Sequence, residues 1–233
     1  EEYGGRECVG DVGEWGVGFF DKSGLWGGVG VFINFSNRTG LPYVWRMDRW
    51  VGYAEAVSVS NRFLQKKFGG ALLPHCRDTT VSDPLKFNPN KIKEKMGFKN
   101  KKVVMFLGTP RPHKGVDDLL TAFKIIDNPD LNLAIIGADN HQEFLERIDR
   151  SIRHRVVVLP KMPFDKLPEL LSAADIIAIP QRRTSDSVGQ IPARLFDAMS
   201  MAKPIIATRM SDIPEALDGC GYLVDPNEPA QLA

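Results

Sequence analysis

From residue 103 onward, the hydrophobic positions of the chain follow two alternating patterns. Runs of consecutive apolar residues, of which Val103–Leu107 is the clearest, lack polar alternation and predict strands that are buried on both faces, as in a parallel sheet covered by helices. Between the runs, apolar residues recur at the spacing of one helical face, for example at Val116, Leu119 and Phe123. Strands that alternate with helices imply right-handed crossovers. The pattern therefore predicts an α/β fold with a Rossmann-like, doubly wound parallel sheet.

The same two patterns set the bounds expected for the later elements. Strands are predicted at 131–136, 156–159, 176–179, 204–207 and 222–224. Helices are predicted from Val116 onward and at 142–152, 165–173, 192–201 and 213–217. Asp165 is a candidate N-cap, and Pro192 suits a first helical turn because its missing N–H is not needed there. A loop is expected at 181–191.

The chain before residue 103 has a weaker pattern. Strands are predicted at 43–47, 56–59 and 71–73, and short helices at 61–68 and 90–97. The first forty residues hold 11 of the 21 glycines, and we expect them to be less ordered than the rest. Within them, Gly27–Gly30 lacks the spacing of a dinucleotide-binding loop. The glycosylation patterns at Asn34 and Asn37 carry no meaning in a cytoplasmic chain.

Composition narrows the function classes. The 233 residues are 43% hydrophobic and 25% charged, as is usual for a soluble globular protein, and the net charge of +1 does not favour nucleic acid as a partner. Three widely separated cysteines, Cys8, Cys76 and Cys220, form neither a metal motif nor a disulfide framework, which indicates a reducing compartment. No apolar run has the length of a membrane span and no signal peptide is recognised, so a cytoplasmic location is expected.

The loop Gly108–Gly115 is the main candidate for a binding site. Two glycines and two prolines punctuate it, and Arg111, His113 and Lys114 give it positive charge. In open α/β sheets, ligands bind outside the carboxyl ends of the strands, and a helix N-terminus favours anions. The loop therefore indicates a site for an anion, most simply a phosphate. The alternative is a solvated basic turn.

Several motifs carry a resemblance to a known family. Besides the loop Gly108–Gly115, they are the run DAMSMAKPIIAT at 197–208, the dipeptide Pro214-Glu215 and the run GYLVDP at 221–226. Their order and spacing resemble the retaining glycosyltransferases of the GT-B fold, the large family 4 type, over roughly residues 42–226. The resemblance implies one full C-terminal domain that binds a nucleotide-diphosphate sugar, expected at 90–233. Residues 1–89 would then form a partial N-terminal, acceptor-side domain and the crossover between the two.

The resemblance also assigns roles to single residues. Lys114 matches the family lysine that contacts the donor diphosphate. The family arginine follows the first glycine, where this chain has Thr109, so Arg111 is expected to replace it. Asp197 matches the second glutamate of the family's Glu-x7-Glu motif and would accept hydrogen bonds from the ribose hydroxyls. The first glutamate is absent, because Gly189 stands eight residues before Asp197.

Further donor contacts are expected at the ends of three strands. Gly108 and Thr109 belong to the phosphate loop, and Gly137 and Asp139 follow the next strand, where nucleobase contacts often lie in the family. Backbone N–H groups before the helix at 192–201 would hold the sugar, and the residues concerned are Ser187, Gly189, Gln190 and Ile191.

Other polar residues lie near this last loop in the sequence. Arg182 and Arg183 add positive charge, and Asp186 is a weaker candidate for the role of the absent glutamate. Arg194 is interpreted as a solvated residue of the helix. His75 lies in the expected crossover, and the sequence assigns it no role.

The resemblance implies glycosyl transfer with retention of the anomeric configuration. The resemblance also implies transfer without a bound metal ion, and the sequence shows no metal-ligand cluster. No other cofactor is expected, and the nucleotide-diphosphate sugar is the donor substrate. The acceptor would be a sugar, a lipid or a small molecule, with peripheral membrane contact left open and no nucleic acid as a partner. Two alternatives remain. A non-catalytic nucleotide-sugar-binding or partner-docking module is favoured by the absent glutamate, whereas a GT-B-fold epimerase or phosphorylase is disfavoured by the run at 197–208.

Overall fold

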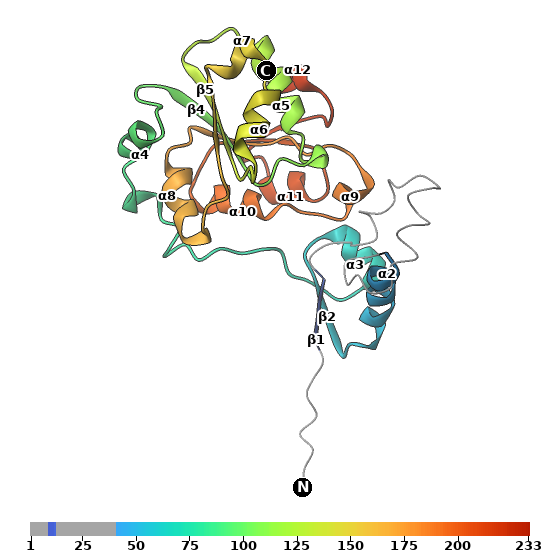
Figure 1. The fold of residues 1–233 in the computed structure, drawn as a ribbon. Coiled ribbons are helices and arrows are strands. Elements are labelled where there is room, and N and C mark those ends of the chain that lie inside the picture. Colours follow the sequence, from blue (N-terminus) through green and yellow to red (C-terminus); the bar gives the residue numbers. More distant parts are fainter. Residues whose placement is uncertain (1–8, 13–40) are drawn as a thin grey trace. The chain divides into compact units, whose positions relative to one another are not determined.

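The computed structural model describes residues 9–12 and 41–233, and they fall into two compact units (Figure 1). The first unit holds the described residues up to His75 together with Arg183–Ile191, and the second holds Cys76–Arg182 and Pro192–Ala233. The boundary expected between residues 89 and 90 lies inside the second unit, and the acceptor and donor roles of the two sides stay predictions. The expectations for Gly27–Gly30, Asn34 and Asn37, and for the order of most of the first forty residues, lie outside the described residues.

A six-stranded parallel sheet forms the centre of the second unit, with the strand order β6-β5-β4-β7-β8-β9 (Figure 1). The strands are β4 (Lys102–Leu107), β5 (Leu131–Ile136), β6 (Val156–Leu159), β7 (Ile176–Ile179), β8 (Ile205–Thr208) and β9 (Tyr222–Val224). All neighbouring strands pair in parallel, which confirms the predicted doubly wound sheet. The chain adds β5 and β6 on one side of β4 and then β7, β8 and β9 on the other. The strand order therefore reverses between β4 and β7, and open α/β sheets bind ligands at such a switch point.

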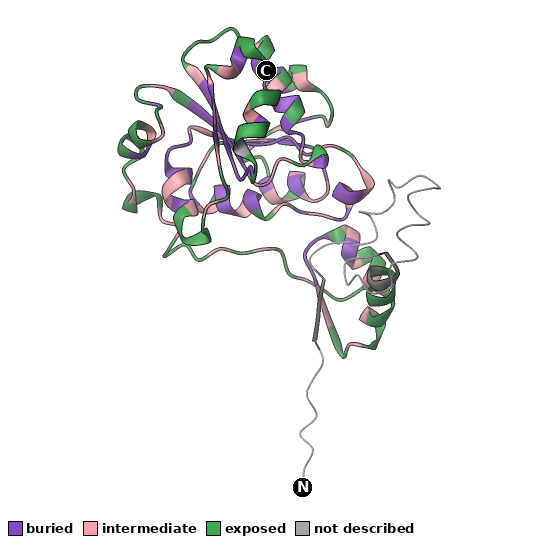
Figure 2. Cartoon of the chain, in the orientation of Figure 1, coloured by how far each residue is buried: buried purple, intermediate pink, exposed green. Residues whose placement is uncertain are grey.

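Helices cover both faces of this sheet. Figure 1 shows α5, α6 and α12 on one side and α8, α10 and α11 on the other. Residues of α5 pack with Phe106 and Ile135 in one hydrophobic core, and residues 103–107 of β4 are at most 7% exposed, as the purple strands of Figure 2 show. The helices are α4 (Pro89–Lys95), α5 (Val116–Ile125), α6 (His141–Arg147), α7 (Arg150–Arg153), α8 (Leu167–Ser172), α10 (Ala193–Ser200), α11 (Ile213–Leu217) and α12 (Pro229–Leu232).

The first unit contains a smaller parallel sheet, in the order β1-β2-β3. Its strands are β1 (Val9–Val12), β2 (Ala56–Val59) and β3 (Ala71–Leu72), and its helices are α2 (Leu41–Trp50), α3 (Arg62–Phe68) and α9 (Ser185–Val188), with the short 3-10 helix η2 (Val51–Tyr53). The side chain of Asn61 caps α3 by accepting a hydrogen bond from Leu64 N at 2.9 Å. The expected strands at 56–59 and 71–73 and the helix at 61–68 are thus confirmed.

The strand predicted at 43–47 is wrong, because these residues belong to the helix α2. The aromatic and β-branched residues of this stretch have a local preference for strands. In the helix, however, side chains four residues apart stack as cation–π pairs. The Cζ of Arg49 lies 4.9 Å from a ring centroid of Trp45, and that of Arg46 lies 5.8 Å from Trp50. These pairs at helical spacing override the strand preference.

Two helix predictions in the second unit also need correction. The helix expected at 142–152 is divided into α6 and α7, because Ile148 is extended and the side chain of Asp149 begins a new helix by accepting from Ser151 N. Asp165 is not an N-cap. It lies inside the 3-10 helix η5 (Phe164–Lys166), and Lys166 occupies the N-cap position of α8. The loop expected at 181–191 contains the short helix α9.

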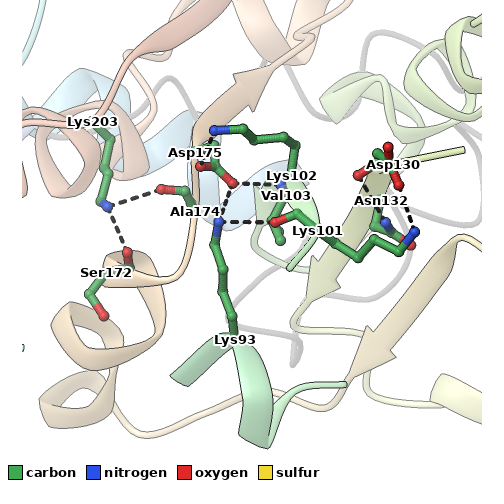
Figure 3. Close-up of polar contacts among 10 residues, drawn as sticks. All are labelled: Lys93, Lys101, Lys102, Val103, Asp130, Asn132, Ser172, Ala174, Asp175 and Lys203. Atoms are coloured by element: carbon green, nitrogen blue, oxygen red, sulfur yellow. Dashed lines mark hydrogen bonds and ion pairs between the residues drawn. The ribbon is translucent and has the colours of Figure 1, made fainter. Parts of the chain in front are cut away.

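A cluster of lysines around Asp175 joins elements at the amino ends of the strands (Figure 3). Asp175 Oδ2 accepts hydrogen bonds from Lys93 Nζ at 2.5 Å and from Val103 N at 2.7 Å, and Lys102 Nζ lies 3.6 Å from Oδ1. Burial favours a higher pKa for this carboxyl. The hydrogen bonds from Lys93 and Val103 N and the charges of Lys93 and Lys102 together outweigh burial, so that the pKa of Asp175 is lowered. Lys203 Nζ donates to two carbonyl groups beside the cluster. These contacts fix the ends of β4, β7 and α4.

Candidate functional site

The loop Gly108–Gly115 connects the carboxyl end of β4 to α5. Its backbone packs closely against neighbouring segments. A Cβ atom on Gly115, whose φ is +71°, would lie 1.7 Å from the carbonyl oxygen of Pro180 at the end of β7. A Cβ atom on Gly137, which follows β5, would lie 2.8 Å from the carbonyl carbon of Gly108. Contacts this close exclude any side chain. The glycines thus bring three strand ends together at the switch point of the sheet.

Two cationic side chains border Gly108. A Cβ atom on this residue would lie 3.4 Å from Lys114 Nζ and 3.4 Å from Arg194 Nη1. Lys114 ends the 3-10 helix η4 (Pro112–Lys114), and the next residue, Gly115, is the N-cap of α5. Arg111 of the same loop is exposed. The loop therefore presents the charge of Lys114, together with a second charge that comes from α10.

The interpretation of Arg194 as a solvated helix residue is wrong. The residue is only 7% exposed, and its Cζ lies 4.8 Å from the centroid of the Phe106 ring. Nη1 donates a hydrogen bond to the carbonyl oxygen of Leu107 at 3.3 Å. Burial lowers the pKa of Arg194 to about 10, which leaves the guanidinium charged at neutral pH. Arg194 therefore lies on the face of α10 that packs against the sheet, and its side chain contacts β4.

The other arginines named from the sequence are placed differently. Arg182 donates from Nε and Nη2 to the two carboxylate oxygens of Asp118, at 2.6 and 2.5 Å, and these hydrogen bonds raise the pKa of Arg182. Its charge thus serves an ion pair that ties the segment after β7 to the first turn of α5. Arg183 is exposed and belongs to the first unit.

A pocket of about 190 Å³ lies at the carboxyl ends of β4 and β5. It brings together two of the predicted donor residues, Thr109 from the phosphate loop and Asp139 from the turn after β5. Asp139 is exposed. The remaining lining residues are Pro110, Ala138, Asn140, Glu143, Phe144 and Arg147. The nucleobase contact that the sequence predicts for this turn stays a prediction.

Asp197 lies on α10 and forms a close ion pair with Arg77. Arg77 Nε donates to Oδ1 of Asp197, while Nη1 and Nη2 donate to the carbonyl oxygens of Cys76 at 2.7 Å and Ala193 at 3.2 Å. The two side chains are 17% and 11% exposed, and the guanidinium carbon lies 5.7 Å from the centroid of the Phe164 ring. Sequence reasoning assigned no role to Arg77. Its partner is 120 residues away in the sequence, so no local pattern indicates the pair.

The Arg77–Asp197 pair forms one wall of a second small cavity. The cavity has a volume of about 110 Å³, and its other polar lining groups come from Asp78, Ser82, Asp165 and Ser200. A carboxylate has about four acceptor positions, so Asp197 keeps acceptor capacity beyond the bond from Arg77. The arrangement is compatible with the expected ribose contact, but it also gives Asp197 a part in holding the unit together.

The residues expected to hold the sugar, Ser187, Gly189, Gln190 and Ile191, lie in the first unit. Ser187 and Thr184 form a capping box at the start of α9, with Ser187 Oγ accepting from Thr184 N at 2.9 Å. Gly189 has a φ of −87°, so its backbone does not require glycine, and its carbonyl accepts from Asn61 Nδ2 at 3.1 Å. Asp186 is buried in the same segment. The sugar-binding role of this segment stays a prediction.

Within 9–12 and 41–233, no group of three or more His, Cys, Asp or Glu residues is placed to hold a metal ion. No helix in this part of the chain is long and apolar enough to cross a membrane.

Comparison with known proteins adds independent information. The family described as Glycosyl transferases group 1 matches residues 101–233, more than half of the chain. A GDP-mannose-dependent alpha-(1-6)-phosphatidylinositol monomannoside mannosyltransferase of Mycolicibacterium smegmatis is 28% identical over 188 residues, which are 74% of this chain and 49% of that protein. A D-inositol 3-phosphate glycosyltransferase of Corynebacterium diphtheriae is 31% identical over 144 residues, which are 57% of this chain and 33% of that protein. The chain spans about half or less of the length of these relatives.

Solved structures share the fold. HepE of Anabaena, in complex with UDP-glucose, matches with a TM-score of 0.73 at 18% identity over 98% of this chain and 61% of that chain. The C-terminal domain of a glycosyl transferase group 1 family protein from Francisella tularensis gives a TM-score of 0.54 at 22% identity over 67% of this chain and 84% of that domain. These likenesses confirm the GT-B type of fold that the motifs predict. Together with the matched family, they place the chain among the group 1 glycosyl transferases.

Proposed function

We propose that this chain binds a nucleotide-diphosphate sugar and transfers its sugar to an acceptor hydroxyl group with retention of configuration. The observation that carries the proposal is the position of Lys114 beside Gly108, at the carboxyl end of β4 and at the switch point of the sheet, in a group 1 glycosyl transferase. An ammonium group at this place suits the charged diphosphate of a donor.

Two similar proteins support the donor class. The relative from Mycolicibacterium smegmatis is named as GDP-mannose-dependent, and HepE was solved in complex with UDP-glucose. Both donors are nucleoside diphosphate sugars, whereas their bases and sugars differ. The proposal for this chain is therefore limited to the diphosphate class, and both compounds are suitable probes.

The proposed reaction exchanges one bond for another at the anomeric carbon. The bond between this carbon and the diphosphate oxygen breaks, and a bond to the acceptor oxygen forms on the same face of the sugar. Because the acceptor attacks from the face that the diphosphate leaves, retention requires no protein carboxylate as a nucleophile. The acceptor proton passes to a diphosphate oxygen, so that no protein base is required either. Negative charge accumulates on the leaving diphosphate, and the fixed charge of Lys114 stabilises it. The mechanism as proposed uses no metal ion and no other cofactor.

Asp197 is a further residue of the proposed donor site in the second unit. Asp197 would accept a hydrogen bond from a ribose hydroxyl in addition to the one from Arg77. We also propose a cytoplasmic location. The cytoplasm is a reducing compartment, and nucleotide sugars would reach the site there.

Exposed side chains of the first unit favour a lipid as the acceptor. Trp45 and Trp50 of α2 are each 54% exposed and Tyr53 is 84% exposed, while Arg46 and Arg49 stack on the two tryptophans. Tryptophan and tyrosine beside arginine are typical of side chains at a membrane surface. Peripheral contact of α2 with a membrane would bring a lipid acceptor to the protein.

A non-catalytic nucleotide-sugar-binding module is the second candidate function. Gly189 stands where the family motif has its first glutamate, and Gly189 has no side chain that could contact the sugar. Such a module would keep Lys114 and bind the donor without turning it over.

Donor binding and turnover separate these candidates. The 233-residue chain is titrated with GDP-mannose and UDP-glucose by calorimetry, and release of free GDP or UDP is then followed in the presence of phosphatidylinositol or inositol phosphate as acceptors. Binding with acceptor-dependent release supports the transferase. Binding without release in any mixture favours the module. Failure of both sugar nucleotides to bind contradicts the proposed function.

A further inference from the structure

Arg194 is a buried guanidinium with unused hydrogen-bonding capacity. Nη1 donates to the Leu107 carbonyl, whereas Nε and Nη2 are buried and have no hydrogen-bond partner in the described part of the chain. The contact with the Phe106 ring stabilises the positive charge from one side but offers no acceptor oxygen. Desolvation is the cause of the lowered pKa of Arg194, and among residues 9–12 and 41–233 no carboxylate counteracts it. A buried charge without a counter-ion is strongly unfavourable.

Arg182 of the same unit shows how the Nε and Nη2 groups of an arginine are used when an acceptor is present. Its Nε and Nη2 donate side by side to the two oxygens of Asp118. The same two nitrogens of Arg194 form a planar fork that has no such partner. A phosphate group, like a carboxylate, presents two oxygens with the spacing that this fork binds. The missing partner of Arg194 therefore has the geometry of an oxyanion.

The position of Arg194 indicates which oxyanion this is. Its Nη1 and Lys114 Nζ border the same glycine, Gly108, at the carboxyl end of β4. The family pattern has an arginine directly after this glycine, where the present chain has Thr109. Arg111, the replacement expected from the sequence, is exposed, and its role stays a prediction. Arg194 reaches the same loop from another element, the first turn of α10.

We propose that Arg194 and Lys114 together bind the diphosphate of the donor, with Arg194 replacing the arginine that is absent at position 109. This inference rests on the proposed donor site and names a further residue of it. Two cationic side chains from two different elements can contact both phosphates of a diphosphate, whereas a monophosphate offers only one phosphate to them. The site therefore selects nucleoside diphosphates over nucleoside monophosphates, and Arg194 is the residue on which this selectivity depends.

Calorimetric titration of three variants, together with Lys114→Ala, tests the inference. Arg194→Met removes the charge and keeps much of the volume, Arg194→Lys keeps the charge and removes the fork, and Arg209→Met is the control at an arginine of the same unit whose side chain is 53% exposed. The probes are GDP and UDP with their matched monophosphates. Arg194→Met should weaken binding of the diphosphate about 10–100-fold and that of the monophosphate far less, Arg194→Lys should weaken the former about 3–10-fold, and the control should bind as the wild type.

Thermal unfolding without ligand provides the second readout. Arg194→Met should melt at the wild-type temperature or above it, because the substitution removes an uncompensated buried charge. Unchanged diphosphate affinity in Arg194→Met overturns the inference, and if that variant does not fold, unchanged affinity in Arg194→Lys does so. If Lys114→Ala loses binding while both Arg194 variants retain it, the inference fails and the donor site stands. If the wild type binds none of the four nucleotides, both fail.

Discussion

Substitution of Asp197 by asparagine should lower the stability of the second unit, because Asp197 holds Arg77. The carboxylate and the guanidinium are 11% and 17% exposed, so the pair is largely shielded from water. A hydrogen bond to a charged group contributes about 1.5–3 kcal/mol and a neutral one about 1 kcal/mol. Asparagine can still accept from Arg77 Nε as a neutral group, and Arg77 keeps its bonds to the carbonyls of Cys76 and Ala193. The free energy of unfolding should therefore fall by about 1–2 kcal/mol.

For a chain of this size, each kcal/mol changes the melting temperature by about 2–4 °C, so Asp197→Asn should melt about 2–8 °C lower. A double-mutant cycle with Arg77→Met isolates the pair. Denaturant unfolding of the wild type, both single variants and the double variant should give a coupling energy of about 1–2 kcal/mol. Effects that add within about 0.5 kcal/mol would show that the two side chains act independently, and the argument from their contact would be refuted.

The same variants test the ribose contact. From the sequence, Asp197→Asn is expected to leave folding almost unchanged and to weaken donor binding. Because Asp197 pairs with Arg77, we now expect the substitution to lower stability. The expected loss of donor binding stays a prediction. The thermal shift induced by GDP-mannose or UDP-glucose should be smaller in Asp197→Asn than in the wild type. If the variant melts lower but shows the full ligand-induced shift, Asp197 is a structural residue and does not contact the donor.

Two further predictions concern the scaffold. Asp175→Asn should lose about 1–3 kcal/mol of stability at pH 7, through weaker bonds to Lys93 and Val103 N. Because the folded-state pKa of Asp175 is lowered, this stability is present above the unfolded value of about 3.9 and is lost as the pH falls through the folded pKa, so denaturation curves of wild type and variant should converge in acid. A constant difference down to pH 2 would contradict the role of the charge. Gly115→Ala should lose at least about 2 kcal/mol, because its Cβ would overlap the Pro180 carbonyl, whereas Gly97→Ala, with φ of +81° and open space, should lose only about 1 kcal/mol. Equal losses in the two alanine variants, measured by urea unfolding, would contradict the steric explanation.

The buried sheet could be predicted from the sequence because its signal is local. Continuous apolar runs such as Val103–Leu107 have only one stable environment, a strand covered on both faces. The same local reasoning gave the wrong result for segment 43–47. Its residue types favour a strand, but Trp45 stacks with Arg49 and Arg46 with Trp50 at helical spacing. Propensity is a weak prior where side-chain pairs at another period compete with it.

The candidate site could be predicted only in part. The loop Gly108–Gly115 and Lys114 follow from motif and position, and the close packing of Gly108, Gly115 and Gly137 gives these glycines a physical reason. The burial of Arg194 could not be predicted, because it depends on Phe106 and Gly108, which lie almost ninety residues away in the sequence. The role of Arg77 was missed for the same reason. Contacts between distant segments decide which charged residues are buried, and no periodic pattern records them.

The central claim is that the second unit binds a nucleotide-diphosphate sugar through Lys114. The most direct test is calorimetric titration of GDP-mannose and UDP-glucose into the wild type, Lys114→Ala and the control Lys99→Ala, a lysine whose side chain is 70% exposed and pairs with Glu94. At least one donor should bind the wild type and the control equally, and Lys114→Ala should lose about 1.5–3 kcal/mol, the contribution of a charge-assisted hydrogen bond. Equal affinity in Lys114→Ala and the wild type, or no binding to the wild type, would contradict the claim.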